Sequence, residues 1–117
     1  VTVKLINSSK ADKNDICTEV FKSKAVLVGS PTVNYGFMYS IGGILEMMKG
    51  LKFKNKKAAA FGSYGWTGEA PKQIHEHLEA SGFQVISDDL KVMWVPDEES
   101  RKLCVQYGRD FVKALEQ

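Results

Sequence analysis

Two short apolar runs with an amphipathic segment between them constrain the fold of this chain more than any other feature. Residues 25–29 are continuously apolar, and residues 57–62 are apolar after their lysine, as in strands covered on both faces of a parallel sheet. The segment between them has apolar side chains at the i, i+3, i+4 and i+7 spacing of a helix that Gly50 ends. These side chains are Ile41, Ile44, Leu45 and Met48. The pattern is typical of a β-α-β unit.

The chain continues this alternation on both sides of the central unit. A short helix is predicted at about residues 14–21, before the first run, and another at about residues 69–81, after the second run. Thr67 is the predicted N-cap of the second of these helices, Pro71 suits its first turn, and Gly82 closes it.

The C-terminal third predicts one more strand and one more helix. Residues 83–86 and 91–95 read as a single strand that is interrupted at residues 87–89. Asp97 caps the last helix. Its apolar row consists of Leu103, Tyr107 and Phe111, with Cys104, Val112 and Leu115 beside them.

Apolar and polar side chains alternate at the N-terminus, which predicts a half-buried edge strand at residues 2–7. With the other elements, this predicts an α/β fold with a mainly parallel sheet and helices on both of its faces. The 117 residues, 44% of them hydrophobic, are expected to form one domain, residues 1–117, with one core.

Composition and charge argue against several classes of function. A net charge of +2 does not indicate a nucleic-acid or membrane partner, although lysines cluster at residues 52–57. The apolar runs are too short to span a membrane, and no leader is visible. Cys17 and Cys104 form no C-x-x-C pair, so a reduced, cytoplasmic protein is expected.

Catalytic and metal-binding motifs are also missing from the sequence. His75 and His77 are two residues apart on a predicted helix, so they point in different directions and cannot bind one metal ion. Ser63 is not part of a G-x-S-x-G motif, and no P-loop or G-x-G-x-x-G motif occurs. We therefore assign no catalytic residue and no metal ligand.

Two loops leave the carboxyl ends of the predicted strands, which is where open α/β sheets bind ligands. Residues 29–36 and 62–68 are rich in glycine, hydroxyl groups and aromatic rings. Glycines let the backbone approach the edge of a flat ring, and Tyr35, Tyr64 or Trp66 can stack on its face. The same composition also occurs in ordinary strand-to-helix turns.

Together, GSPT at residues 29–32 and AFGSYGWTG at residues 60–68 resemble the flavodoxin-like domain of the flavodiiron proteins, or A-type flavoproteins, which include rubredoxin:oxygen oxidoreductase and flavorubredoxin. The likeness extends from about residue 25 to residue 115. It implies a flavodoxin-like three-layer α/β/α sandwich with FMN between the two loops. The FMN-binding residues implied by the resemblance are Ser30, Pro31, Thr32, Asn34, Ser63, Tyr64, Gly65, Trp66 and Gly68.

The resemblance also implies redox partners. In that family the FMN relays electrons from a rubredoxin-like or reductase partner to a di-iron centre that reduces oxygen or nitric oxide. The His, Asp and Glu ligands of that centre belong to a separate domain and have no counterpart in this chain. We expect an electron-transfer domain of an oxidoreductase, without a complete catalytic site of its own.

The family's first strand and its Ser/Thr/Gly-rich phosphate loop have no counterpart either, because Ser8 and Ser9 have no glycine nearby. FMN would then lose several charge-assisted hydrogen bonds of about 1.5–3 kcal/mol each, which lowers its expected affinity by several powers of ten. Residues 2–7 take the place of the second strand, and the missing first strand would separate them from residues 25–29. Unpaired strand edges invite other chains, so we expect strand re-pairing or a homo-oligomer.

Two other functions fit the same loops. The chain would be a flavin-free interaction or regulatory module if the loops are purely structural. It would be an NAD(P)H:quinone oxidoreductase if the fold carries that activity instead.

Overall fold

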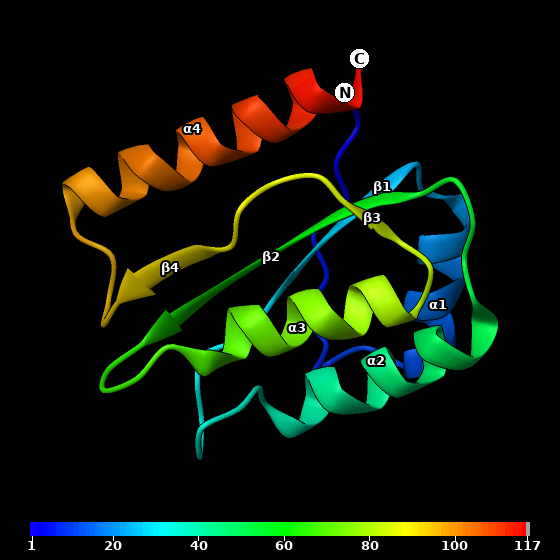
Figure 1. The fold of residues 1–117 in the computed structure, drawn as a ribbon, viewed down its shortest axis with the longest axis horizontal. Helices are drawn as coiled ribbons and strands as arrows, with labels where there is room; N and C mark the ends of the chain where they lie inside the picture. Colours follow the sequence, from blue (N-terminus) through cyan, green and yellow to red (C-terminus); the bar gives the residue numbers. More distant parts are fainter. Residues whose placement is uncertain (117) are drawn as a thin grey trace.

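The computed structural model describes residues 1–116 and has an α/β architecture, as the sequence predicts. Helices and strands alternate along the chain (Figure 1). The helices are α1 (Lys13–Lys22), α2 (Tyr39–Leu51), α3 (Glu69–Ala80) and α4 (Glu98–Leu115). The strands are β1 (Ala25–Gly29), β2 (Lys57–Tyr64), β3 (Gln84–Val85) and β4 (Leu90–Met93).

All strand pairs of the sheet are parallel. β1 lies along one edge of β2, with Ala25 opposite Lys57, and both β3 and β4 lie along the other edge. β3 pairs with the start of β2 and β4 with its end, so the two short strands act as one strand with a break between them. This confirms the predicted interruption.

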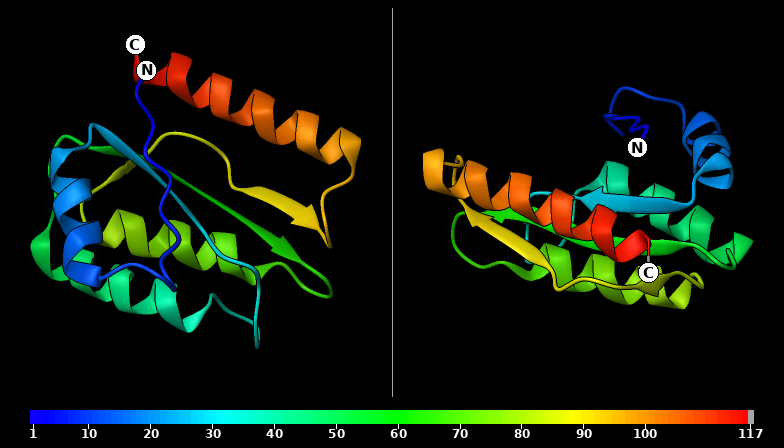
Figure 2. Two further views of the ribbon diagram at one scale, coloured as in Figure 1. Left: turned by 180° about the vertical axis from the view of Figure 1, so that it is seen from behind. Right: turned by 90° about the horizontal axis from the view of Figure 1, so that it is seen from above.

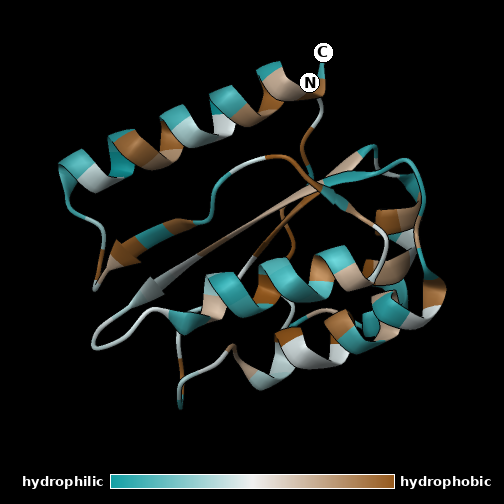
Figure 3. Cartoon of the chain, viewed as in Figure 1, coloured by the Kyte–Doolittle hydropathy of each residue, from teal (hydrophilic) through white to brown (hydrophobic). Residues whose placement is uncertain are grey.

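The two faces of the sheet are covered differently. Helices α1, α2 and α3 lie on one face, while α4 lies on the other (Figures 1 and 2). Apolar side chains of the three helices pack with β1 and β2. Brown segments mark the hydrophobic residues of these helices in Figure 3. The core on this face includes Leu45, Met48, Ile74, Leu78, Phe53, Phe83, Ala58 and Ala60.

On the opposite face, α4 buries little of its apolar row. Phe111 is 4% exposed, but Leu103, predicted to lie in the same row, is 64% exposed. The Tyr107 hydroxyl donates to the carbonyl oxygen of Asp88 at 2.6 Å and so attaches α4 to the segment between β3 and β4. Leu27 and Phe61, which point to this face, are 43% and 39% exposed. Much apolar surface on this side therefore remains in contact with solvent.

The predicted strand at residues 2–7 is wrong. These residues form no strand and lie beyond the outer edge of β1 (Figure 2), and Val3 and Leu5 are 79% and 94% exposed. The segment is held instead by Ile6, which packs against the core, and by the Lys4 ammonium, 2.9 Å from Glu19. The hydrogen bond from Lys4 lowers the pKa of Glu19. Alternation describes a half-buried segment, but a strand also needs a neighbouring backbone to pair with.

Helix ends differ from the prediction in two places. Gly50 does not end α2, which continues to Leu51 and is followed by Lys52 in the left-handed region at φ 48°. Thr67 does not cap α3, because the N-cap position is Gly68 and no side chain of that residue is available. Gly82 closes α3 as predicted, at φ 98°, where a Cβ atom would collide with the Phe53 carbonyl oxygen.

The remaining caps agree with the sequence. Asp97 caps α4 by accepting a hydrogen bond from the Ser100 peptide N–H at 2.8 Å, which lowers the pKa of the Asp97 carboxyl. No helix within residues 1–116 is long and apolar enough to cross a membrane.

Candidate functional site

Three loops meet at the carboxyl ends of the strands, at the left-hand side of Figure 1. They are residues 30–38 after β1, residues 65–68 after β2, and residues 94–97 after β4. β2 is two residues longer than the sequence predicts, so Ser63 and Tyr64 belong to the strand. The sequence predicts a ligand site at the first two loops and indicates no site residue in the third.

Ser30 organises the first loop from inside. It is 3% exposed, and its hydroxyl accepts a hydrogen bond from the Met38 peptide N–H at 2.7 Å and donates one to the Pro31 carbonyl oxygen at 2.8 Å. The hydroxyl thus joins the two ends of the loop just before α2. In this arrangement Ser30 shapes the loop, and its side chain does not face solvent.

The tip of the first loop is a tight turn with a strained backbone. Val33 and Gly36 exchange two backbone hydrogen bonds of 2.8 and 3.0 Å, and both residues between them are left-handed, Asn34 at φ 50° and Tyr35 at φ 63°. Positive φ is rare for a bulky residue such as tyrosine. The Gln73 side chain of α3 holds the turn by donating to the Tyr35 carbonyl oxygen at 2.9 Å. The Tyr35 ring remains 68% exposed.

Thr32 connects the first loop to β2 and α3, the two elements on either side of the second loop. Its peptide N–H donates to the Ser63 carbonyl oxygen at 2.8 Å, and its hydroxyl accepts from the Ala70 peptide N–H at 3.2 Å. Thr32 therefore performs from a distance the capping role that the sequence assigned to Thr67. A Cβ atom on Gly62 would collide with the Ser30 carbonyl oxygen, so the start of the first loop is also in close backbone contact with β2.

The rim formed by these loops is aromatic and exposed. Trp66 is 89% exposed, Trp94 is 66% exposed and Tyr39, at the start of α2, is 94% exposed. The predicted site residues of the first and second loops lie on adjacent strand ends, so the structure brings the two sets together. An exposed aromatic rim beside peptide groups is suited to a flat ring with a polar edge.

Two helices begin at this rim without side-chain caps of their own. Met38 and Gly68 occupy the N-cap positions of α2 and α3, and neither provides a capping side-chain hydrogen bond. Peptide N–H groups at helix N-termini favour negative charge. Glu69, the first residue of α3, has one buried carboxylate oxygen, Oε2, without a hydrogen-bond partner among the described residues. The rim thus offers peptide N–H donors, whereas this Glu69 oxygen has no surface open to a ligand.

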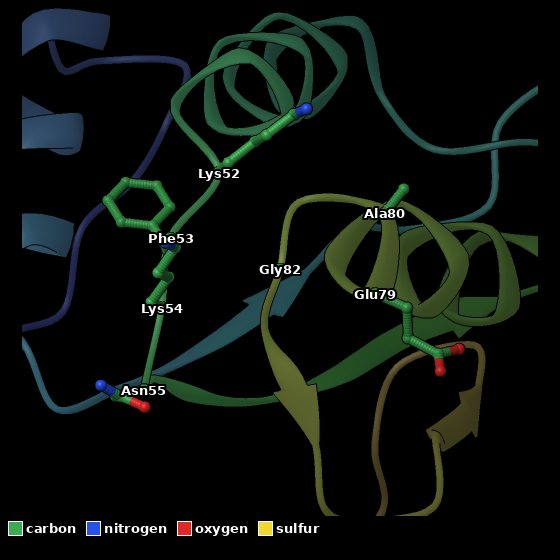
Figure 4. A pocket seen from close by; sticks show the side chains of 7 residues that line it. All are labelled: Lys52, Phe53, Lys54, Asn55, Glu79, Ala80 and Gly82. Carbon is green, nitrogen blue, oxygen red and sulfur yellow. The ribbon is translucent and has the colours of Figure 1, made fainter.

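A shallow pocket of about 580 Å³ lies at the opposite end of the sheet (Figure 4). It is lined by Lys52, Phe53, Lys54, Asn55, Glu79, Ala80 and Gly82. Because α2 and α3 both end here, its lysines lie near helix C-termini, where cations are stabilising. No ligand is therefore needed to explain the lysine cluster at residues 52–57.

The two histidines point to different partners, as their spacing predicts. His75 lies between two carboxylates, with Nδ1 2.7 Å from Asp89 and Nε2 3.1 Å from Glu79. The His77 ring packs edge-on against Phe37, and its Nδ1 is 2.9 Å from the Gln73 carbonyl oxygen. Within residues 1–116, no group of three His, Cys, Asp or Glu side chains could hold a metal ion.

Comparisons with known proteins agree with this geometry. The family model described as flavodoxin matches residues 1–108. An anaerobic nitric oxide reductase flavorubredoxin from Klebsiella pneumoniae is 48% identical over 113 residues, covering 97% of this chain and 23% of the relative. The chain thus spans about a quarter of the length of that relative.

Solved structures give the same result. Rubredoxin oxygen:oxidoreductase from Desulfovibrio gigas matches 98% of this chain with a TM-score of 0.93 and 36% identity, over 29% of its own length. An archaeal flavodoxin matches the full chain with a TM-score of 0.87 and 27% identity, over 80% of its own length.

Proposed function

The chain belongs to the flavodoxin family, and from this premise we propose that it binds FMN at the carboxyl-end loops and acts as an electron-transfer domain. The observation that carries the proposal is the link from the first loop to the two elements that flank the second, in which Thr32 donates to the Ser63 carbonyl oxygen of β2 and accepts from the N-terminus of α3. This link holds two glycine-rich aromatic loops side by side at the strand ends, where open α/β sheets bind ligands.

The groups at the rim fit the isoalloxazine ring of a flavin. The exposed residues Tyr35 and Trp66 supply aromatic surface, and the start of α2, which has no side-chain cap, supplies peptide N–H donors. Flavin edges carry hydrogen-bond acceptors that suit such donors, so the donor set and the aromatic surface suit the same ligand.

FMN, when bound, supplies one- and two-electron redox chemistry. The chain's own residues bind and orient it: Ser30 and Thr32 hold the first loop in place, and Gln73 fixes its tip. The helix N-termini of α2 and α3 favour negative charge at the rim. We assign the FMN-binding role to Ser30, Pro31, Thr32, Asn34, Ser63, Tyr64, Gly65, Trp66 and Gly68.

The partners of the chain follow from the relatives in this proposal. The name of the flavorubredoxin refers to nitric oxide reduction, and the name of the rubredoxin oxygen:oxidoreductase refers to oxygen. Both names refer to rubredoxin. We propose that this chain accepts electrons from a rubredoxin-like or reductase donor and passes them to a di-iron centre outside residues 1–117.

The proposal is tested by titrating the purified protein with FMN and with riboflavin, followed by the quenching of flavin fluorescence and by the visible absorption spectrum. If the loops bind the ring, both flavins bind, and riboflavin binds nearly as well because the loops contact the ring rather than the phosphate. Trp66→Ala should weaken binding about tenfold, because ring stacking contributes about 0.5–1.5 kcal/mol beyond buried area.

Leu103→Ala is the matched control, because Leu103 is also exposed but lies on α4, outside the three loops. It should leave flavin affinity unchanged. A protein that ignores both flavins at saturating concentration would contradict the proposal and favour a flavin-free module. Rapid quinone-dependent oxidation of NAD(P)H by the flavin-loaded protein would favour the oxidoreductase alternative.

We also propose that the chain self-associates. The outer edge of β1 pairs with no other strand of residues 1–116, and an unpaired edge is a template for another chain. Sedimentation velocity over a range of concentrations tests this, and a monomer throughout would contradict it.

A further inference from the structure

Trp94 has a backbone conformation that is unusual for a residue with a large side chain. It directly follows β4, in the third loop, and adopts a left-handed φ of 56°. A bulky residue at positive φ is a genuine outlier that the surrounding structure must enforce. Here the enforcing contact is on β2, because the Trp94 peptide N–H donates to the Tyr64 carbonyl oxygen at 2.7 Å. The pairing of β2 with β4 thus extends one residue past the last register pair, Tyr64 with Met93.

The indole ring of Trp94 lies against the turn that leaves β2. A Cβ atom placed on Gly65 would be 3.0 to 3.3 Å from the ring atoms Cζ3, Cη2 and Cε3. The benzo part of the indole therefore packs close to the Gly65 backbone. A side chain at residue 65 would be in tight contact with the ring, and the ring would have to shift by a few tenths of an ångström to admit it.

A core-packing role does not explain this ring. Trp94 is not part of the buried cluster, it is 66% exposed, and its neighbours Met93 and Val95 are 54% and 82% exposed. The described contacts of the residue are instead directed at two consecutive residues, Tyr64 and Gly65, both of which are candidate flavin-binding residues. The ring is thus placed where it restricts one specific turn.

We propose that Trp94 is a positioning residue that fixes the 64–66 turn for the flavin, an inference that rests on the proposed function. Gly65 on its own is the residue with the greatest backbone freedom in that turn. Contact with the indole removes much of this freedom before any ligand arrives. A turn ordered in advance binds its ligand more tightly, because less conformational entropy is lost on binding.

The test is a double-mutant cycle of Trp94→Ala and Gly65→Ala, with Trp94→Phe as the conservative variant. The first readout needs no ligand and is the backbone NMR order parameters of residues 65 and 66. We expect about 0.85 in the wild type and below about 0.6 in Trp94→Ala, with most of the order recovered in Trp94→Phe. Gly108→Ala is the control, because nothing lies within 4 Å of a Cβ atom at that position.

The second readout is flavin affinity across the same cycle. Trp94→Ala should weaken FMN binding about tenfold through loss of pre-ordering. Gly65→Ala should weaken it at least as much when Trp94 is present, because the new methyl group meets the ring, and much less when residue 94 is alanine. Such non-additivity would identify the contact between the indole ring and residue 65 as the cause of the change in flavin affinity.

Two results would overturn the inference: unchanged order parameters in Trp94→Ala, or additive effects of the two substitutions. Unfolding of Trp94→Ala, detected by circular dichroism, would also contradict it, since a positioning residue outside the core should not be needed for folding. Failure of the wild type to bind FMN or riboflavin overturns the proposed function and the flavin part of this inference. The order parameters then decide independently whether Trp94 fixes the turn.

Discussion

On one face of the sheet, three helices bury the side chains that β1 and β2 direct toward them, while on the other face α4 lies alone beside apolar residues that remain half-exposed. Leu45 and Leu27 illustrate the difference, because they are 0% and 43% exposed on opposite faces. Parallel sheets are normally covered on both faces. Most of the stability of this chain therefore comes from the face of the sheet that the three helices cover, and α4 is attached to the other face through a few contacts.

The largest effect is expected for Leu45→Ala on the well-covered face. Leu45 is fully buried among α2, α3 and the sheet, so its truncation leaves a cavity that the packing cannot close. We expect a loss of about 2–5 kcal/mol in the free energy of unfolding, measured by urea denaturation. A loss below about 1 kcal/mol would mean that this face is not the main source of stability.

A smaller and more local effect is expected for Phe111→Ala. Phe111 is the one residue of α4 that is fully buried, so its loss should release α4 while the three-helix face stays folded. Amide hydrogen exchange should accelerate by at least about tenfold throughout α4 and change little in α2 and α3. Equal acceleration in all helices would show that both faces unfold as one unit.

Tyr107→Phe tests the polar attachment of α4 and carries a pH signature. Burial, with smaller contributions from the Asp89 and Asp88 carboxylates, raises the pKa of Tyr107 to about 12. Because this pKa is higher in the folded than in the unfolded state, the neutral hydroxyl stabilises the fold below pH 10, and that stabilisation is lost as the pH rises from about 10 to 12.

At neutral pH, the loss of the hydrogen bond to Asp88 should lower stability by about 0.5–1.5 kcal/mol. The difference in unfolding free energy between the wild type and Tyr107→Phe should then shrink between pH 10 and pH 12. Urea denaturation at several pH values measures it, and a constant difference would argue against a buried tyrosine hydroxyl.

The smallest effect is expected for Leu27→Ala, the counterpart of Leu45→Ala on the open face. Because Leu27 is already 43% exposed, its truncation should change the free energy of unfolding by about 1 kcal/mol or less. A loss as large as that of Leu45→Ala would show that the open face is covered in solution, for example by a second chain.

The sequence predicted the elements that depend on local pattern. The helix with Ile44, Leu45 and Met48 and the strand at residues 25–29 follow from periodicity, and the structure confirms both. The break between β3 and β4 was also visible, in the polar residues 87–89. The residues implied to bind FMN remain a prediction, although the structure brings both loops to one rim.

Features that depend on partners distant in sequence were missed. The cap of α3 comes from Thr32, which is 38 residues away from Ala70, so no local signal identifies it. The strand predicted at residues 2–7 is wrong for a similar reason, since alternation says nothing about whether a pairing strand is present. Trp94 was passed over because the sequence predicted it within a strand at residues 91–95, whereas the strand ends at Met93 and the Trp94 ring contacts Gly65.

The left-handed residues of the rim have a consequence for how this protein responds to selection. Asn34, Tyr35 and Trp94 hold conformations that each cost about 1–3 kcal/mol, whereas glycine would adopt them almost freely. A screen for thermal stability alone should therefore enrich Tyr35→Gly, and it would do so by removing an aromatic ring from the rim. A screen that also demands flavin binding should retain that ring. The two screens would therefore select different residues at position 35.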